Sequence, residues 1–379
     1  MVRYSSIVLC FAVALLVALG MVMLSSTSVW AEGGGPYTFV KSQAISIAIG
    51  LVMAIAAARL PDGVVRKYWP WALAFVCVLL ALCFVPGIGK DINGSRRWVR
   101  VPVFGSFQPS EFARVVCVIT LAGWFARWQT ETRTFWRGFI IPGMLVGLPI
   151  GLTAIETNMG AALSMSLACA LTLFCAGTRL RLLLPTMAMG LLAAYFFARH
   201  NENRWTRIEA WRDLEHHQKD KGQQQWRALI ALGNGGPTGV GLGNGAEKFG
   251  NLPYAHTDFI FPEIGEELGL PFTLGTVLCY VLIGVGGIGI ASQANTPFAR
   301  VTAIGLTCMI VVPAMQNIAV TTACLPNDGL PLPFVSYGGS SIMFALMSVG
   351  LLVGIQRRSL PECDIETVLV RDRRFAIRL

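Results

Sequence analysis

Long apolar runs separated by short polar segments dominate the chain. A bilayer core about 30 Å thick needs roughly 20 apolar residues per helix, and ten segments approach that length. They are residues 6–28, 41–59, 70–86, 109–126, 139–156, 160–177, 181–198, 270–291, 300–323 and 335–355. The pattern predicts an all-α polytopic membrane protein with about ten transmembrane helices.

One polar interruption is much longer than the others. Between about residues 199 and 269 the apolar runs stop, and charged side chains and histidines take their place. Long connecting segments in compact folds are usually functional. Within this loop, apolar residues recur at near-helical spacing over 203–225, which predicts one amphipathic helix in the membrane interface. Glycines crowd residues 233–245 and predict repeated turns.

The first apolar run resembles a secretory signal in two respects. Arg3 precedes it, and Val29-Trp30-Ala31 resembles a cleavage site. The run is longer than the usual apolar stretch of about 7–15 residues in a signal peptide. We therefore expect a retained first transmembrane helix. The chain then forms a single transmembrane domain over residues 1–358 and a polar tail over 359–379.

Composition supports the membrane class. Of the 379 residues, 54% are hydrophobic and 13% are charged, whereas a soluble chain is about 25% charged. Most of the ten cysteines lie inside apolar runs without metal-site spacing, so they are interpreted as small buried hydrophobic residues. We see no nucleic-acid-binding module, and we attribute the net charge of +9 to topology and to an anionic partner.

Cationic residues beside the spans indicate the orientation, because they mark the cytoplasmic side of a membrane. An even number of spans places both termini on one side. With the N-terminus in the cytoplasm, the short inner loops and the tail hold Arg59, Arg66, Lys67, Arg127, Arg133, Arg137, Arg179, Arg181, Arg300, Arg357 and Arg358. The outer side also carries many cations, for which a phosphate-bearing ligand at the outer surface supplies a reason.

The first candidate site lies near the end of the long loop. The string AHTDFIFPEIGEELG, residues 255–269, places Asp258 two residues after His256. A carboxylate at an apolar rim can act as a general base when a substrate hydroxyl comes within hydrogen-bond reach. Lys248 can neutralise a phosphate or Asp258, and His256 and Glu266 are further candidate substrate contacts. A salt bridge that only orders the loop is the alternative interpretation.

The second candidate site opens the fourth span. The string DINGSRRWVRVPVFGSFQPSEFARV, residues 91–115, includes Arg96, whose guanidinium fork matches phosphate oxygens. Glu111 and Arg114 are i, i+3 neighbours on one helix face. Ionisable residues inside a membrane are costly, so they either serve function or pair with each other. Both interpretations remain open for Glu111 and Arg114.

The third candidate site precedes the last span. The string LPNDGLPLPFVSYGGSS, residues 325–341, is rich in proline and glycine. Such backbone at membrane depth must line a cavity or be buried in protein. Ser336 and Ser340 offer hydroxyls near a helix N-terminus, which is a common anion site. A tight re-entrant turn without a ligand explains the same pattern.

Two other patterns carry little weight. The glycines of residues 239–245 resemble a dinucleotide-binding loop, but no strand precedes them. His216 and His217 are adjacent, and adjacent residues on a helix face different ways. The sequence therefore assigns no metal-binding residue.

Together, three strings resemble the signature blocks of the SEDS family (shape, elongation, division and sporulation), the polytopic peptidoglycan glycosyltransferases. They are VPGIGKDINGSRRWVRVPVFGSFQPSEFAR, GVGLGNGAEKFGNLPYAHTDFIFPEIGEELG and LPNDGLPLPFVSYGGSS, in the family's order. The resemblance runs from the first span to about Arg358. It implies ten transmembrane helices with a large extracytoplasmic loop between the seventh and eighth. The strings SSTSVWA and VPGIGKDINGSRRW favour the division branch over the elongation branch.

The resemblance maps the aspartate that the family treats as essential onto Asp258. It implies lipid II as substrate, with the C4 hydroxyl of an acceptor sugar attacking the anomeric carbon of the growing strand and undecaprenyl pyrophosphate leaving with inversion. Asp258, with an ordinary pKa near 4, is the expected base. Lys248, Arg96 and Arg114 are candidate phosphate contacts. No cofactor is certain, and a divalent cation (Mg²⁺ or Mn²⁺) is left open.

The chain departs from the family pattern in three places. The string ETNMG puts Asn158 where the family usually has the acid of a Gln/Glu-Pro-Asp-x-Gly string. Pro262 and Glu263 replace two typically apolar residues. Asn327 and Asp328 stand where the family commonly has Thr with Thr or Lys.

The resemblance also implies partners and a location. These are a class B penicillin-binding protein that supplies transpeptidation, other division-site proteins and membrane lipid, at the division site of the bacterial cytoplasmic (inner) membrane. No nucleic acid is expected. A lipid II flippase, an elongation-type polymerase and a scaffold that only recruits wall enzymes are the alternatives.

Overall fold

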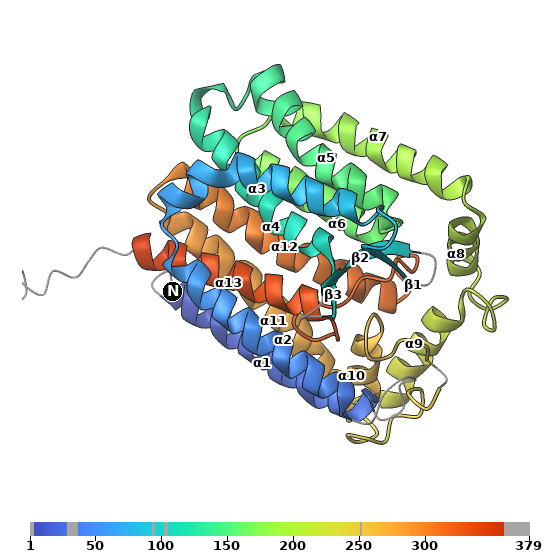
Figure 1. The fold of residues 1–379 in the computed structure, drawn as a ribbon. Coiled ribbons are helices and arrows are strands. Elements are labelled where there is room, and N and C mark those ends of the chain that lie inside the picture. The colour runs from blue at the N-terminus through green and yellow to red at the C-terminus, as the bar shows by residue number, and fades with distance from the viewer. Residues whose placement is uncertain (1–3, 29–36, 93–94, 102–104, 251, 360–379) are drawn as a thin grey trace, which may run out of the picture.

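The structure is a bundle of long helices with a small sheet and a partly helical loop at one end (Figure 1). The computed structural model describes residues 4–28, 37–92, 95–101, 105–250 and 252–359. The helices are α1 (Ser5–Thr27), α2 (Thr38–Arg59), α3 (Asp62–Leu82), α4 (Pro109–Arg127), α5 (Ile141–Ile155), α6 (Met159–Cys175), α7 (Leu180–Arg199), α8 (Glu202–Arg212), α9 (Gln223–Gly235), α10 (Ile260–Leu268), α11 (Leu270–Gln293), α12 (Pro297–Thr321) and α13 (Gly339–Ser359). A 3₁₀ turn, η3 (Gln129–Glu131), and a π turn, η4 (Trp136–Ile140), precede α5.

A helix occupies most of each of the ten predicted spans. Among the described residues, nine helical segments are long and apolar enough to cross a bilayer, with η4 and α5 counted together, and the apolar α6 adds 17 residues. The all-α polytopic fold is therefore confirmed. The boundaries differ most from the prediction in α3 and α13. The charged turn around Arg66 already belongs to α3, which begins at Asp62, and α13 begins only at Gly339 because the residues before it form a loop.

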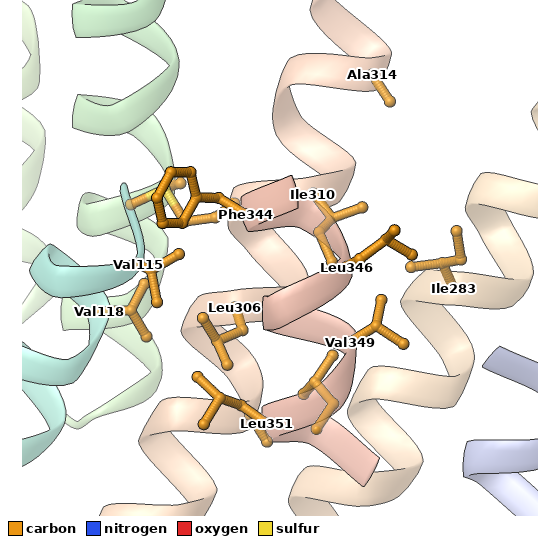
Figure 2. Packing of buried hydrophobic residues seen from close by; sticks show 14 of the residues in the cluster. Val115, Val118, Ile283, Leu306, Ile310, Ala314, Phe344, Leu346, Val349 and Leu351 are labelled. Carbon is orange, nitrogen blue, oxygen red and sulfur yellow. The ribbon is translucent and has the colours of Figure 1, made fainter. Parts of the chain in front are cut away.

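Helices α4, α12 and α13 form the centre of the bundle. In the most apolar 18-residue window of each helix, 78% of the residues of α4 are buried, against 6% for α7. Figure 2 shows Val115 of α4, Leu306 and Ile310 of α12, and Leu346 of α13 converging in this core. In contrast, α7 lies at the edge of the bundle beside α5 and α6 (Figure 1), so its apolar surface is suited to contact lipid.

The start of α1 and the end of α13 lie at the same end of the bundle, opposite the long loop. The backbone N–H of Ser6 donates to Gln356 at 2.6 Å, and Arg358 pairs with Asp62 at 2.6 Å. At the other end of α1, the hydroxyl of Ser26 contacts the long loop. This arrangement agrees with an even number of spans.

A small antiparallel sheet precedes α4, an addition to the helices that the sequence predicted. Its strands are β1 (Gly89–Ile92), β2 (Ser95–Val101) and β3 (Gly105–Phe107), in the order β1-β2-β3. Successive side chains on a strand point to opposite faces. Arg97 therefore shares a face with the buried Val99, whereas Arg96 shares a face with the exposed Arg100.

The long loop differs from the prediction of one amphipathic helix over 203–225. Helix α8 ends at Arg212, turns cover residues 213–222, and α9 begins at Gln223. Asp213 ends the first helix and accepts hydrogen bonds from the backbone and the ring of His216. Trp211 donates to the carbonyl of Ala323 at 2.8 Å. Trp211 at the end of α8 thus contacts the loop that follows α12, and the prediction of a single helix over 203–225 is wrong.

Helices α2 and α13 pack so closely that one glycine cannot carry a side chain without movement. A β-carbon on Gly350 would lie 2.1 Å from the carbonyl oxygen of Ala54. We expect Gly350→Val to destabilise the protein by about 1–3 kcal/mol, the usual cost of overpacking. Gly275→Val in α11 is the matched control, because a β-carbon there meets nothing within 4 Å. Equal melting temperatures of the two variants in detergent would contradict the packing argument.

Candidate active site

Two of the three predicted strings are joined by hydrogen bonds next to Asp258. The backbone N–H of Tyr337 donates to the carbonyl of His256 at 3.0 Å, and the hydroxyl of Ser336 donates to the carbonyl of Thr257 at 2.5 Å. These bonds hold the turn before α10 against the loop before α13. The structure therefore joins segments that are about 80 residues apart in the sequence, as the 79-residue separation of the Ser336 bond shows.

Asn317, near the end of α12, contacts both of these segments. Its side-chain amide donates to the carbonyl of Asp258 at 2.7 Å and to the carbonyl of Leu330 at 2.6 Å. The side chain is 1% exposed. Asn317 binds the backbone carbonyl of Asp258 rather than its carboxylate. It therefore positions Asp258 and leaves the carboxylate of Asp258 available. The sequence analysis missed this residue, which stands inside an otherwise apolar run.

The carboxylate of Asp258 is a stronger base than the sequence suggested. Burial raises the pKa of Asp258 from its ordinary value to about 6. The positive charges of Arg97 and Arg207 act in the opposite direction and lower this pKa, while the charge of Asp328 raises it. The expected pKa near 4 is thus corrected upward, although the group remains mostly ionised at pH 7.

The sheet determines which arginine reaches this carboxylate. Arg97 acts on Asp258 electrostatically, and its Nε is buried without a hydrogen-bond partner among the described atoms. Arg96, the predicted phosphate contact, is exposed on the other face of β2. Arg207 approaches from α8. A guanidinium beside a general base is well suited to bind the oxygens of a phosphate group.

Lys248 lies in a buried ion pair that does not include Asp258. Its ammonium group donates to Glu267 at 2.6 Å and to the hydroxyl of Ser26 at 2.8 Å. The side chains of Lys248 and Glu267 are 2% and 0% exposed. This is the loop-ordering salt bridge that the sequence left open, with Glu267 as the partner.

Neighbouring acids on α10 hold the glycine-rich part of the loop. Glu266 accepts hydrogen bonds from the backbone N–H groups of Ala246 and Glu247, both at 3.2 Å. Glu263 is fully buried, and burial together with the charges of Glu266 and Glu267 raises the pKa of its carboxyl to about 8. Glu263 is therefore mostly protonated, and so uncharged, at neutral pH. An uncharged carboxyl is compatible with a position where the family usually has an apolar residue.

Glu111 and Arg114 form an ion pair at the start of α4, which is one of the two interpretations that the sequence left open. The distance between Arg114 Nη1 and Glu111 Oε2 is 3.1 Å, and both side chains are nearly buried. They line a small cavity of about 20 Å³ together with Ser341 and Ser348, a space that holds about one water molecule. Arg114 Nε and Nη2 have no hydrogen-bond partner among the described atoms.

The remaining predicted contacts have defined places. Besides its bond to the Thr257 carbonyl, the Ser336 hydroxyl accepts the backbone N–H of Leu332 at 2.8 Å, and the Ser340 hydroxyl accepts that of Gln108 at 3.1 Å. Both hydroxyls thus stabilise the loop and the start of α4. The ring of His256 packs against that of Phe39 at 5.0 Å, and burial lowers the pKa of His256.

These features define a class: a multi-pass helical membrane protein in which two loop segments meet around a half-buried carboxylate that interacts electrostatically with two arginines. A family model described as "Cell cycle protein", which covers FtsW, RodA and SpoVE, matches residues 6–360. The chain belongs to this family, as the resemblance of its three strings indicated.

Relatives and solved structures match over nearly the whole chain. "Probable peptidoglycan glycosyltransferase FtsW" of Geobacter sulfurreducens (strain DL-1 / KN400) is 36% identical over 359 residues, 94% of this chain and 96% of the relative. The protein of the same name from Coxiella burnetii (strain RSA 493 / Nine Mile phase I) is 36% identical over 351 residues, with 90% and 93% covered.

Two solved structures share the fold. A chain from work on the structural coordination of polymerization and crosslinking by a peptidoglycan synthase complex superposes with a TM-score of 0.76 at 25% identity, covering 93% of this chain and 98% of that one. The rod shape determining protein RodA of Thermus thermophilus has a TM-score of 0.69 at 25% identity, with 93% and 97% covered.

Proposed function

We propose that this protein is a peptidoglycan glycosyltransferase that polymerises lipid II during cell division, with Asp258 as the general base. The observation that carries the proposal is the half-buried Asp258 carboxylate, which lies where the loop before α10 meets the loop before α13 and whose pKa, raised to about 6 by burial, is lowered by the charges of Arg97 and Arg207. The names of the relatives support both the activity and the division branch.

The chemistry follows from the charges at the site. The acceptor sugar must lose the proton of its C4 hydroxyl as that oxygen bonds to the anomeric carbon of the growing strand, and Asp258 accepts this proton. Undecaprenyl pyrophosphate departs from the opposite face of that carbon, which inverts its configuration. Pyrophosphate needs cations rather than a strong acid, and Arg97 and Arg207 supply positive charge.

A divalent cation remains a proposal. Among the described residues, no three His, Cys, Asp or Glu side chains converge as a metal site. Mg²⁺ is commonly bound by one or two carboxylates plus substrate phosphates. The pyrophosphate of the substrate supplies such phosphate oxygens, so the cation is expected to enter with the substrate.

The proposed setting is the bacterial cytoplasmic membrane, with both termini in the cytoplasm and the Asp258 site on the outer side. The start of α1 and the end of α13 lie opposite the long loop, which supports this topology. The proposed partner is a class B penicillin-binding protein at the division site. The resemblance to a chain of a peptidoglycan synthase complex supports this kind of partner.

The direct test is polymerisation of labelled lipid II by the purified chain together with its cognate transpeptidase, with and without Mg²⁺ or Mn²⁺. Glycan strands resolved on a gel are the expected product. Transbilayer movement of lipid II in vesicles without any polymer would instead identify a flippase. Neither activity, in a protein that still binds its transpeptidase, would indicate a scaffold.

The pKa of Asp258 predicts the pH dependence of polymerisation. A general base works in its ionised form, so activity should be present above the pKa and lost as the pH falls through it. We expect kcat/KM, which reports the free enzyme, to reach half its plateau near pH 6. Initial rates between pH 4.5 and 8 with purified lipid II measure this. A half-maximum near pH 4 would contradict the buried environment of Asp258.

A further inference from the structure

The loop between α12 and α13 brings a second acid next to Asp258. A β-carbon built on Gly329 would lie 3.3 Å from the Oδ2 atom of Asp258, and Gly329 directly follows Asp328. The charge of Asp328 raises the pKa of Asp258, and Arg207 lowers the pKa of both carboxyls. The two carboxylates therefore share one electrostatic environment.

The same acid lies against the start of α6. A β-carbon on Gly160 would lie 3.1 Å from Asp328 Cβ and 3.0 Å from its carbonyl oxygen. Asn158, two residues earlier, is 4% exposed, and its amide donates to the Ser110 hydroxyl at 3.4 Å. The start of α6, which carries the amide at position 158, thus contacts the loop that carries the acid at position 328, and both residues depart from the family pattern.

Side chains of helix α12 form hydrogen bonds with both Asp258 and Asp328. The side-chain amide of Gln316 donates to Asp328 Oδ2, and the backbone N–H of Leu330 donates to Asp328 Oδ1 at 3.3 Å. The next residue, Asn317, binds the backbone of Asp258. Because consecutive residues of one rigid helix hold the two acids, their separation is fixed by the fold.

We propose that Asp328 is the second carboxylate of the active site, a positioning residue whose negative charge strengthens Asp258 as a base and replaces the acid that position 158 lacks. The inference rests on the proposed function of Asp258. It assigns to Asp328 no direct bond to substrate.

The physical basis is the interaction of like charges. Two neighbouring carboxylates do not ionise independently, because the first charge makes the second less favourable. Arg207 from α8 acts on both carboxyls, Arg97 from β2 acts on Asp258, and Gln316 from α12 donates to Asp328. Arg97 also acts on Glu156, at the end of α5, and His256 lies two residues before Asp258. Removing the charge of Asp328 leaves Asp258 facing the two arginines alone.

The first experiment is the pH profile of Asp328→Asn. We expect the half-maximum of kcat/KM to move to lower pH, and the plateau rate to fall by up to about tenfold because a weaker base accepts the proton less readily. Asp328→Glu, which keeps the charge, should retain the wild-type profile. Asp220→Asn, at an exposed position in the turn after α8, is the control. An unchanged half-maximum in folded Asp328→Asn would overturn the inference.

The second experiment moves the acid back to position 158. The double variant Asn158→Asp with Asp328→Asn should recover the half-maximum and most of the rate lost in Asp328→Asn alone. A positioning charge predicts this rescue, whereas a purely structural role of Asp328 does not. Melting temperatures in detergent verify that each variant is folded. A folded double variant no better than Asp328→Asn would count against the inference.

The outcomes separate this inference from the proposed function. If Asp258→Asn is inactive but Asp328→Asn leaves the pH profile unchanged, only the role of Asp328 is excluded. Active Asp258→Asn would remove the base itself, and the inference would fall with it.

Discussion

Replacing Asp258 with Asn is expected to abolish polymerisation of lipid II while leaving the protein folded. Asn has nearly the same shape but cannot accept the proton of the attacking hydroxyl. A positioned general base contributes about 10²–10⁴-fold to a rate, so the variant should lose activity by about that factor. Gel analysis of glycan strands from labelled lipid II, with the wild type measured in parallel, gives the ratio.

The fold should survive this change for two reasons. Asn317 contacts the backbone carbonyl at position 258, which the substitution retains. The pKa of the Asp258 carboxyl is raised to about 6 in the folded protein, so its ionisation opposes folding as the pH rises through that value. At pH 7 the Asn variant should therefore melt at the same temperature as the wild type or higher. Full activity of folded Asp258→Asn would exclude the carboxylate as the base.

The matched control is Asp220→Asn, which removes the same charge from the same long loop. Asp220 is exposed in the turn between α8 and α9, so wild-type activity is expected. An equal loss in both variants would mean that the net charge of the loop, rather than a base at position 258, determines the rate.

The sequence predicted the span pattern well because it depends on local composition. The length of each apolar run is enough to identify a helix that crosses a bilayer, and a helix occupies most of each of the ten predicted runs. Asp258 was also proposed from local sequence, as the acid of a distinctive polar string. These predictions need no knowledge of which segments meet in space.

The surroundings of Asp258 depend on long-range packing, and the sequence predicted them poorly. Arg96 was chosen over Arg97 because the strand β2, which places them on opposite faces, was not expected. Asn317 acts on residues at separations of 59 and 13 positions, a relation that no local pattern encodes. Lys248 was assigned to phosphate or to Asp258, yet its partner Glu267 is one of several acids on α10 that the string alone does not distinguish.

Replacing Lys248 with Met is expected to destabilise the protein strongly. The Met side chain can fill the volume but leaves Glu267, which is fully buried, without its cation. Removal of one partner of a buried ion pair costs about 3–5 kcal/mol. Because Glu267 also accepts the backbone N–H of Gly243 at 2.9 Å, the glycine-rich part of the loop should loosen, and polymerisation should fall with stability.

The double variant Lys248→Met with Glu267→Gln distinguishes a structural role from a role in binding phosphate. It removes both charges, and Gln can still accept the hydrogen bond from Gly243, so most of the lost melting temperature and activity should return. Lys219→Met, at an exposed position in the same loop, is the control for the loss of a cation. If Lys248→Met instead keeps the wild-type melting temperature but loses affinity for lipid II, and Glu267→Gln brings no recovery, Lys248 contacts the pyrophosphate directly and the ion pair is incidental.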